Sequence, residues 1–182
     1  MQIKSALWRS CRTIACDTRL QLLWLLFREK ELCVSAVAES LHIGNAQASQ
    51  QLHILNERGL ICFRREKMQV YYRPEANELV EFAPRLLEGL RQCYERQMAH
   101  NTVIRQATAL THERRIEVVR ALDRTAMSWN DLAAATGMSD SSLFLHLGKL
   151  EARGFVLKTG DAWRLTRPQN RFGSHLLRIA LS

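Results

Sequence analysis

Amide side chains crowd into one short stretch of the sequence. The stretch contains Asn45, Gln47, Gln50 and Gln51, and it is followed closely by His53. An amide can donate one hydrogen bond and accept another, which matches the major-groove edge of adenine. These residue types and their spacing predict recognition of base edges in a nucleic acid. A polar helix surface that faces only solvent is the alternative interpretation.

Basic side chains follow further along the chain, and they are Arg64, Arg65, Lys67 and Arg73. Positive charge beside an amide-rich helix would contact phosphate, which adds affinity without sequence information. The whole chain has a formal net charge of +8, which favours a polyanionic partner such as nucleic acid or an anionic membrane surface. Its longest apolar run, "LLWLLF", is far too short to span a bilayer, so no membrane span is expected.

Nucleophilic and metal-ligating residues form no recognisable constellation. The five cysteines all lie at or before residue 93 and include no CxxC pair, so neither a disulfide framework nor a zinc finger is indicated. The six histidines have no nucleophile or carboxylate at catalytic spacing, and no glycine-rich phosphate loop is present. The sequence predicts no enzyme, no metal and no cofactor. The amino terminus lacks the pattern of a secretory signal, so a cytoplasmic location is expected.

The amide run should lie on a helix, over residues 45–58, because apolar residues recur along it at helical spacing. Ala48, Leu52 and Leu55 would face the core, and Gly59 would end the helix in the left-handed conformation. Two segments, "LICFRRE" and "MQVYYR", then predict a hairpin with a charged tip over residues 64–68.

Further helices are expected on both sides of this unit. Two helices before it should be separated near Asp17, with Asp17 or Thr18 as the cap of the second, and a short helix should cover residues 35–41. After the hairpin, Pro74 suits a first helical position. Apolar residues then continue from Leu79 toward Val103, with a kink or a restart expected at Pro84.

The same order of elements returns later in the chain. The stretches "LHILNERGLI" and "LGKLEARGFV" begin at Leu52 and Leu147, and the glycines Gly59 and Gly154 occupy the same place in each. The second copy continues into a shorter hairpin, "FVLKTGDAWRLT". We therefore predict a mainly α fold with small β-wings, built from tandem winged helix-turn-helix domains over residues 1–100 and 101–182.

The first half resembles the ArsR/SmtB family of small bacterial repressors. The resemblance rests on "DTRLQLLWLL", "ELCVSAVAESLHI", "SQQLHILNERGLI" and "RREKMQVYYR". It implies a cytoplasmic dimer that leaves DNA when a metal or redox signal arrives. The second half resembles the broader winged-helix class through "DLAAATGMSDSSLFLHLGKLEARGFV", without the wing signature of the family.

Members of this family carry three kinds of sensor site, and the residues of this chain match each kind to a different extent. Arsenic-sensing members carry a Cys-Val-Cys pair, whereas this chain has Cys33 with Ser35 at the second position. Zinc-sensing members place carboxylates and histidines on the last helix, which here offers glutamates and only His100. Redox-sensing members pair two thiols, and Cys33 with Cys93 would be that pair. The alternative is that both cysteines are small buried hydrophobes.

The function expected from these features is sequence-specific recognition of double-stranded DNA by a transcriptional regulator, most simply a repressor. The helix over residues 45–58 would read the major groove, and the helix over residues 140–153 would be a second reader. The second unit would contribute Ser141, Ser142, His146, Lys149 and Lys158. The rival interpretation is a protein-interaction module, because Phe144 and Leu145 are poor hydrogen-bonding readers.

Two assemblies are compatible with a tandem chain. One polypeptide could form a monomeric pseudo-dimer, with residues 86–103 as a packing and connecting helix and residues 1–13 in the same interface. Alternatively, an ordinary homodimer could form through the terminal helices of the first unit, with the second unit appended. The first arrangement predicts an asymmetric DNA site, because the two recognition helices differ.

Overall fold

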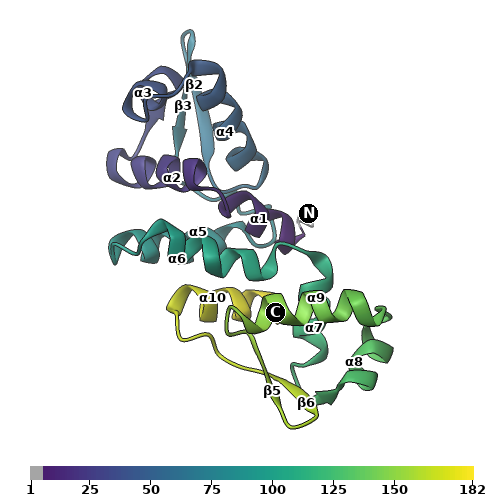
Figure 1. Ribbon diagram of the computed structural model, residues 1–182. Helices are drawn as coiled ribbons and strands as arrows, with labels where there is room; N and C mark the ends of the chain where they lie inside the picture. The colour runs from purple at the N-terminus through teal and green to yellow at the C-terminus, as the bar shows by residue number, and fades with distance from the viewer. Residues whose placement is uncertain (1–5) are drawn as a thin grey trace.

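The computed structural model describes residues 6–182, and its first half is a helical unit with a small sheet (Figure 1). Its elements are α1 (Leu7–Ile14), α2 (Asp17–Glu29), β1 (Leu32–Cys33), α3 (Val34–Ser40), α4 (Asn45–Glu57), β2 (Cys62–Glu66), β3 (Gln69–Arg73) and α5 (Ala83–Glu95). The three strands are antiparallel in the order β1-β3-β2. Together β2 and β3 form the wing that the sequence predicted.

The helix α4 is held by the apolar residues that the periodicity identified. Ala48, Leu52 and Leu55 are all buried. Gly59 follows the helix with a φ of 67°, and a Cβ at this position would lie 2.9 Å from the side chain of Val80. Glycine is therefore required here both for the left-handed backbone and for the close approach of the next segment.

The second half repeats the first. Its elements are α6 (His100–Ala107), the 3-10 turn η1 (Thr108–Leu110), α7 (Glu113–Ala121), β4 (Met127–Ser128), α8 (Trp129–Thr136), α9 (Asp140–Glu151), β5 (Val156–Thr159), β6 (Ala162–Leu165) and α10 (Arg171–Ala180). The sheet order β4-β6-β5 matches that of the first half, and Gly154 has a φ of 76°. The predicted fold class, mainly helical with small β-wings, is confirmed.

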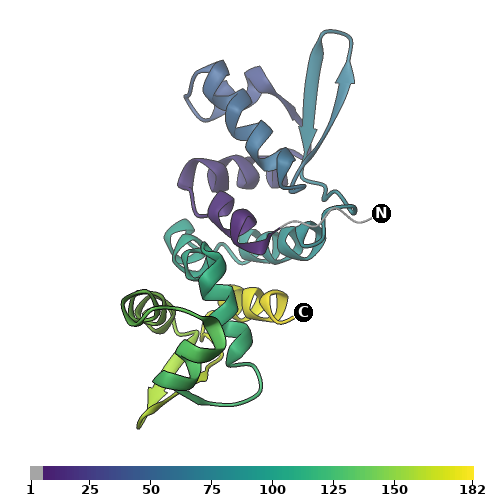
Figure 2. The same ribbon diagram turned by 90° about the vertical axis from the view of Figure 1, so that its right-hand side faces the viewer.

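A layer of four helices joins the two halves. The helices α1, α5, α6 and α10 lie between the two wings, which point to opposite ends of the molecule (Figures 1 and 2). Within this layer α10 packs against α5 and α6, and α1 packs against α6. A Cβ on Gly89 of α5 would lie 2.5 Å from the imidazole of His175 on α10, so this glycine permits the close approach of the two helices.

The four helices of the layer are related by the same internal repeat. The buried residues of α1, among them Leu7, Cys11 and Ile14, correspond in spacing to Val103, Ala107 and Leu110 of α6 and η1. Likewise α10 follows the wing of the second unit, as α5 follows the wing of the first. The helix α10 was not predicted from the sequence. The repeat of elements divides between α5 and α6, close to the proposed boundary of residues 1–100 and 101–182, which stays a prediction.

Several local predictions were wrong. Pro74 does not begin a helix, because the following segment is held in an irregular conformation. The backbone N–H of Asn77 donates a hydrogen bond of 2.9 Å to the backbone carbonyl of Gly59. The helix begins at Ala83, with Pro84 in its first turn. The expected helix over residues 86–103 is two helices, α5 and α6, separated by residues 96–99.

Two smaller corrections concern ends of elements. The cap of α2 is Cys16, and its side chain makes no capping hydrogen bond. Asp17 instead accepts one hydrogen bond from the Gln21 side chain, and its other carboxylate oxygen lies 2.8 Å from Nδ1 of His100. The wing turns at Lys67 and Met68, so Arg64 and Arg65 lie within β2 and not at the tip. Residues 1–5 of the segment expected to join the interface lie outside the described residues.

Candidate nucleic-acid interface

The exposed face of α4 carries most of the predicted amides. Asn45, Gln47 and Gln50 are exposed and make no side-chain hydrogen bond within residues 6–182. His53 is exposed as well, with its Nε2 3.4 Å from a carboxylate oxygen of Glu57. The N-terminal half of the helix thus presents a row of polar groups with their donors and acceptors available.

Gln51 differs from the other amides. Its side chain is half-buried, and its Oε1 accepts a hydrogen bond of 2.9 Å from Nη1 of Arg19 on α2. Arg19 also donates to the backbone carbonyl of Thr13. Gln51 is therefore held against the body of the unit, and its contact with a base would require the loss of this hydrogen bond.

Arg64 is engaged within the wing itself. Its guanidinium donates to both carboxylate oxygens of Glu31, at 2.8 and 2.6 Å, and to Glu66 at 2.5 Å. It also lies over the ring of Tyr71, 4.8 Å from the centroid. Hydrogen bonding from Arg64 lowers the pKa of Glu31, and the same pair raises the pKa of Arg64. Two carboxylates thus offset the positive charge of Arg64, which was predicted from the sequence to contact phosphate.

These two carboxylates were not among the residues predicted from the sequence. Glu66 follows Arg64 by two residues on the same strand, and this spacing places both side chains on one face, so the pattern was available. Glu31 lies 33 residues away and reaches the wing only because β1 pairs with β3. No local pattern could reveal that contact.

The remaining cations of the wing are more available. Arg65 and Lys67 are exposed and form no ion pair within residues 6–182, and Lys67 adopts a φ of 54° in the turn. Arg73 is paired with Glu75 through a contact of 2.5 Å. The positive charge that can face a partner is therefore concentrated near the tip, at Arg65 and Lys67.

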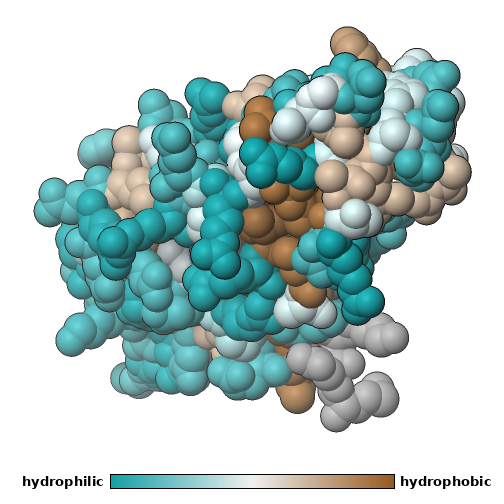
Figure 3. Space-filling view, turned by 90° about the horizontal axis from the view of Figure 1, so that it is seen from below, coloured by the Kyte–Doolittle hydropathy of each residue, from teal (hydrophilic) through white to brown (hydrophobic). Residues whose placement is uncertain are grey.

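The second unit presents a different surface. On α9, Ser141 and Lys149 are exposed and Ser142 is half-buried, while Lys158 is exposed on β5. Between them stand two large apolar side chains, Phe144 at 69% and Leu145 at 60% exposure. Figure 3 views this end of the molecule and shows hydrophobic residues gathered among hydrophilic ones.

His146 is directed toward the body of the second unit. Its ring lies 4.7 Å from that of His112, centroid to centroid, and its Nδ1 is buried without a hydrogen-bond partner among the described residues. Burial lowers the pKa of His146, with the positive charges of His112 and Arg115 adding to the effect. A half-buried imidazole whose charged form is disfavoured is a weaker candidate for DNA contact than the sequence suggested.

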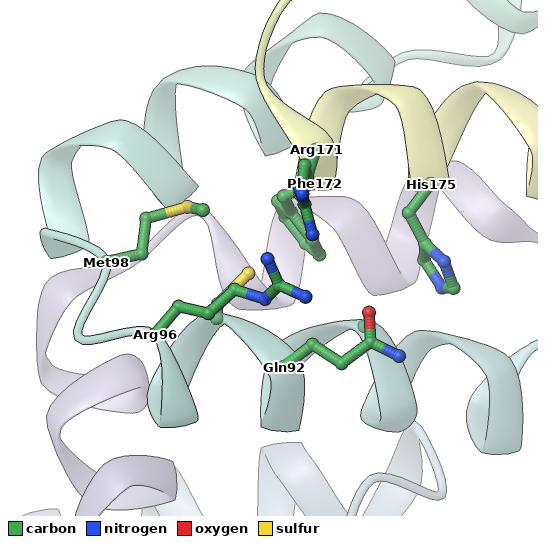
Figure 4. Close-up of a pocket in the computed structure, with 8 residues that line it drawn as sticks. Gln92, Arg96, Met98, Arg171, Phe172 and His175 are labelled. Carbon is green, nitrogen blue, oxygen red and sulfur yellow. The ribbon is translucent and has the colours of Figure 1, made fainter.

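The two predicted sensor thiols have different surroundings. Cys33 is half-buried, its Sγ is 3.2 Å from the hydroxyl of Ser35, and hydrogen bonding lowers its pKa. Cys93 on α5 is buried, and this burial raises its pKa to about 12. They line different hollows, and the one beside Cys93 has a volume of only about 10 Å³. Figure 4 shows that hollow, with the side chain of Arg96, the residue after α5, extending toward Phe172 of α10.

Residues 6–182 show neither a metal-binding cluster nor a membrane-spanning helix. No group of three or more His, Cys, Asp or Glu side chains is arranged to hold a metal ion there. No helix in that range has the length and apolar character needed to cross a membrane.

Family models match two separate parts of the chain. Residues 16–62, which run from the N-cap of α2 to the first residue of β2, match the model of the bacterial regulatory protein, arsR family. Over these residues the chain is similar to the arsR family, as the sequence predicted. Residues 105–175 match a domain of unknown function (DUF7347), so the second unit gains no assignment from its match.

Two curated relatives are transcriptional regulators by name. The chain is 36% identical over 72 residues to the arsenic resistance transcriptional regulator ArsR1 of Pseudomonas putida, across 38% of this chain and 56% of that protein. It is 36% identical over 61 residues to the cadmium resistance transcriptional regulatory protein CadC homolog of Staphylococcus aureus, across 34% of this chain and 50% of that protein. The chain thus spans about half the length of each relative.

A solved structure shows a weaker likeness. Reduced HlyU from Vibrio cholerae N16961 covers 50% of this chain and 87% of its own, with 23% sequence identity and a TM-score of 0.41. A likeness at this level carries no argument about function.

Proposed function

We propose that this protein is a DNA-binding transcriptional regulator, acting as a repressor, whose first unit reads the major groove of double-stranded DNA with α4. The observation that carries the proposal is the exposed row of Asn45, Gln47 and Gln50 on a helix that is followed by a wing. Amide groups on such a helix can make the paired hydrogen bonds that distinguish one base from another. The regulatory names of the two curated relatives support the same class of function.

The wing would supply affinity through phosphate contacts. Arg65 and Lys67 are the cations available for this role, because Arg64 and Arg73 are already paired with carboxylates. Phosphate contacts fix the position of a protein on the duplex and carry no sequence information. Replacement of these two residues should therefore weaken binding to all sequences alike.

The second unit would lie beside the first on the same duplex as a covalent counterpart. Its support is the layer of α1, α5, α6 and α10, in which the end helices of the two units pack together as two subunits of a dimer would. We infer a monomeric pseudo-dimer, with the boundary near residue 100 and an asymmetric DNA site. On α9, Ser141 and Lys149 would contact DNA. A homodimer with an appended second unit is the competing assembly, and the molar mass in solution distinguishes the two.

A second candidate function rests on α9 alone. Phe144 and Leu145 are exposed apolar side chains that cannot read bases by hydrogen bonding, and exposed apolar groups commonly mark protein contacts. In this alternative the second unit docks a protein partner while α4 binds DNA. Loss of partner binding without loss of DNA affinity in a Phe144→Ser, Leu145→Ser variant would favour it.

The experiment that tests the main proposal is genomic footprinting followed by binding to the recovered duplex. Gln47→Ala and Gln50→Ala should reduce discrimination against single base changes by about 1 to 3 kcal/mol at particular positions. Gln92→Ala is the matched control, because Gln92 is an exposed amide on α5, away from α4 and the wing. Unchanged base preference in both α4 variants, or absence of any bound duplex, would overturn the proposal.

A further inference from the structure

A basic hollow lies between α1 and the C-terminal end of α4, two elements that are neighbours in both ribbon views (Figures 1 and 2). We call it the four-arginine hollow, and it has a volume of about 410 Å³. Its lining includes Arg9, Arg12, Arg19, Arg58, Trp8 and Ile54. No carboxylate lines it.

The charges of this hollow are not neutralised by the protein. None of its four arginines forms an ion pair within residues 6–182. Arg19 donates only to neutral oxygens, those of Gln51 and of the Thr13 backbone. Nε of Arg58 is buried and has no acceptor among the described residues. Guanidinium groups gathered in this way repel one another, and an anion between them would remove the repulsion.

The internal repeat supplies a comparison within the same chain. Arg9, Arg19 and Arg58 correspond to Arg105, Arg115 and Arg153 in the second unit, whereas Arg12 corresponds to Thr108. There Arg153 donates through Nε to the Thr108 hydroxyl at 2.7 Å, Arg115 donates to the Thr111 hydroxyl at 2.6 Å, and Arg105 donates to the Ala152 carbonyl at 2.8 Å.

Each of these arginines in the second unit therefore donates to at least one oxygen of that unit, although Nε of Arg115 is buried without an acceptor among the described residues. In the first unit, arginine at position 12 removes the hydroxyl acceptor that its counterpart Thr108 provides, and it adds a fourth positive charge. Arg12 is exposed and makes no hydrogen bond through its side chain within residues 6–182, so it serves no visible structural purpose. The two copies thus differ in the extra charge of Arg12 and in the missing hydroxyl acceptor for Arg58, and an anion in the first copy would offset both.

We propose that the four-arginine hollow binds a small phosphate-bearing anion of about the size of a nucleoside phosphate. Its volume falls within the range of about 300 to 1,000 Å³ that is typical of small-molecule sites. Arginines recognise phosphate through paired, charge-assisted hydrogen bonds. The half-buried ring of Trp8 lies beside them, and the guanidinium of Arg9 lies over this ring, 5.2 Å from its centroid. A planar base would have to displace Arg9 or stack on the opposite face of the ring.

The position of the hollow favours a small anion over the phosphates of the DNA that α4 would read. Ile54 and Arg58 follow Asn45 by nine and thirteen residues, which along a helix corresponds to about 14 to 20 Å. They follow Gln50, the last of the exposed amides, by four and eight residues, or about 6 to 12 Å. The exposed amides lie toward the N-terminal end of α4, and the hollow is at its other end, against α1. A ligand there could be bound while α4 is in the groove.

The test is isothermal titration calorimetry of the full chain, without DNA, using inorganic tripolyphosphate and adenosine triphosphate as probes. Arg12→Gln together with Arg58→Gln should weaken the binding of tripolyphosphate about 100-fold, since each charged hydrogen bond contributes about tenfold or more. Arg12→Gln alone, which removes an exposed side chain, should weaken it about tenfold with the melting curve unchanged. Arg28→Gln together with Arg124→Gln removes the same charge elsewhere and should leave binding intact.

Tighter binding of adenosine triphosphate than of tripolyphosphate, lost in Trp8→Leu, would support a role for the ring. The inference would be overturned if neither probe binds the unaltered chain, or if the variants of the hollow and the control weaken binding equally. It would also be overturned if the Arg12 and Arg58 changes reduce only DNA affinity, because the hollow would then be a contact for the DNA backbone. Because the calorimetry contains no DNA, the absence of phosphate binding would refute this site and leave the proposed DNA-binding function unaffected.

Discussion

The most informative perturbation of the proposed interface compares two cations of the wing that differ in their partners. Lys67 is exposed in the turn without an ion pair, whereas Arg64 donates three hydrogen bonds to Glu31 and Glu66. Each phosphate neutralised by a protein cation contributes about −0.9 to the slope of log affinity against log salt. Lys67→Gln should therefore make the slope less steep by about 0.9, and Arg64→Gln should leave it nearly unchanged.

The expected size of this effect is within reach of a fluorescence anisotropy titration. A slope of 0.9 over a fourfold range of salt, from about 50 to 200 mM, corresponds to a factor of about 3.5 in affinity. The substrate is a labelled duplex recovered by genomic footprinting, and Lys30→Gln is a control for an exposed lysine on the loop after α2. A larger change of slope for Arg64→Gln than for Lys67→Gln would refute the reasoning, because it would mean that the ion pairs of Arg64 open on binding.

Three further predictions concern the layer between the units, the thiols and the ion pair of the wing. Gly89→Leu should clash with His175 and lower stability by about 1 to 3 kcal/mol, measured by thermal melting, with Gly148→Leu at an open position as the control. Iodoacetamide should modify Cys33 well before Cys93 at neutral pH, followed by mass spectrometry, because a lowered pKa increases the thiolate fraction and burial protects Cys93. The lowered pKa of Glu31 means that its ion pair stabilises the fold above the ordinary carboxyl pKa and that this contribution is lost as pH falls through the lowered value. Replacing it with glutamine should therefore reduce the loss of melting temperature on acidification, and an equal loss in both proteins would contradict the assignment.

The fold could be predicted where the information is local. Helical spacing of Ala48, Leu52 and Leu55 and the stop at Gly59 defined α4, and the repeat of the same pattern around Gly154 defined its counterpart. These signals depend only on residues within one or two turns of each other. Burial of one face and a left-handed glycine are enough to determine such an element.

The errors came from contacts that join distant parts of the chain. A helix of ten residues such as α10 is marginal by itself, and it is held by packing against α5, which is about ninety residues earlier. Pro74 was assigned to a helix start, but the Asn77 to Gly59 hydrogen bond holds that segment in another conformation. Local propensity cannot report either effect.

The candidate site was predictable in kind and only partly in detail. Residue type and spacing identified the exposed amides of α4, which lie where the sequence placed them. They could not reveal that Arg19 binds Gln51, that Glu31 binds Arg64, or that His146 lies beside His112. In each case the partner comes from another element, so the availability of a side chain depends on tertiary structure.

The junction of α5 and α10 belongs to a single polypeptide, and this has a consequence for how the molecule responds to dilution. Association between separate subunits weakens as their concentration falls, whereas segments tethered on one chain meet at an effective concentration set by the linker, typically millimolar for short connections. The pairing of the two halves within one chain is therefore independent of copy number, so this contact would persist in a cell that holds only a handful of these molecules.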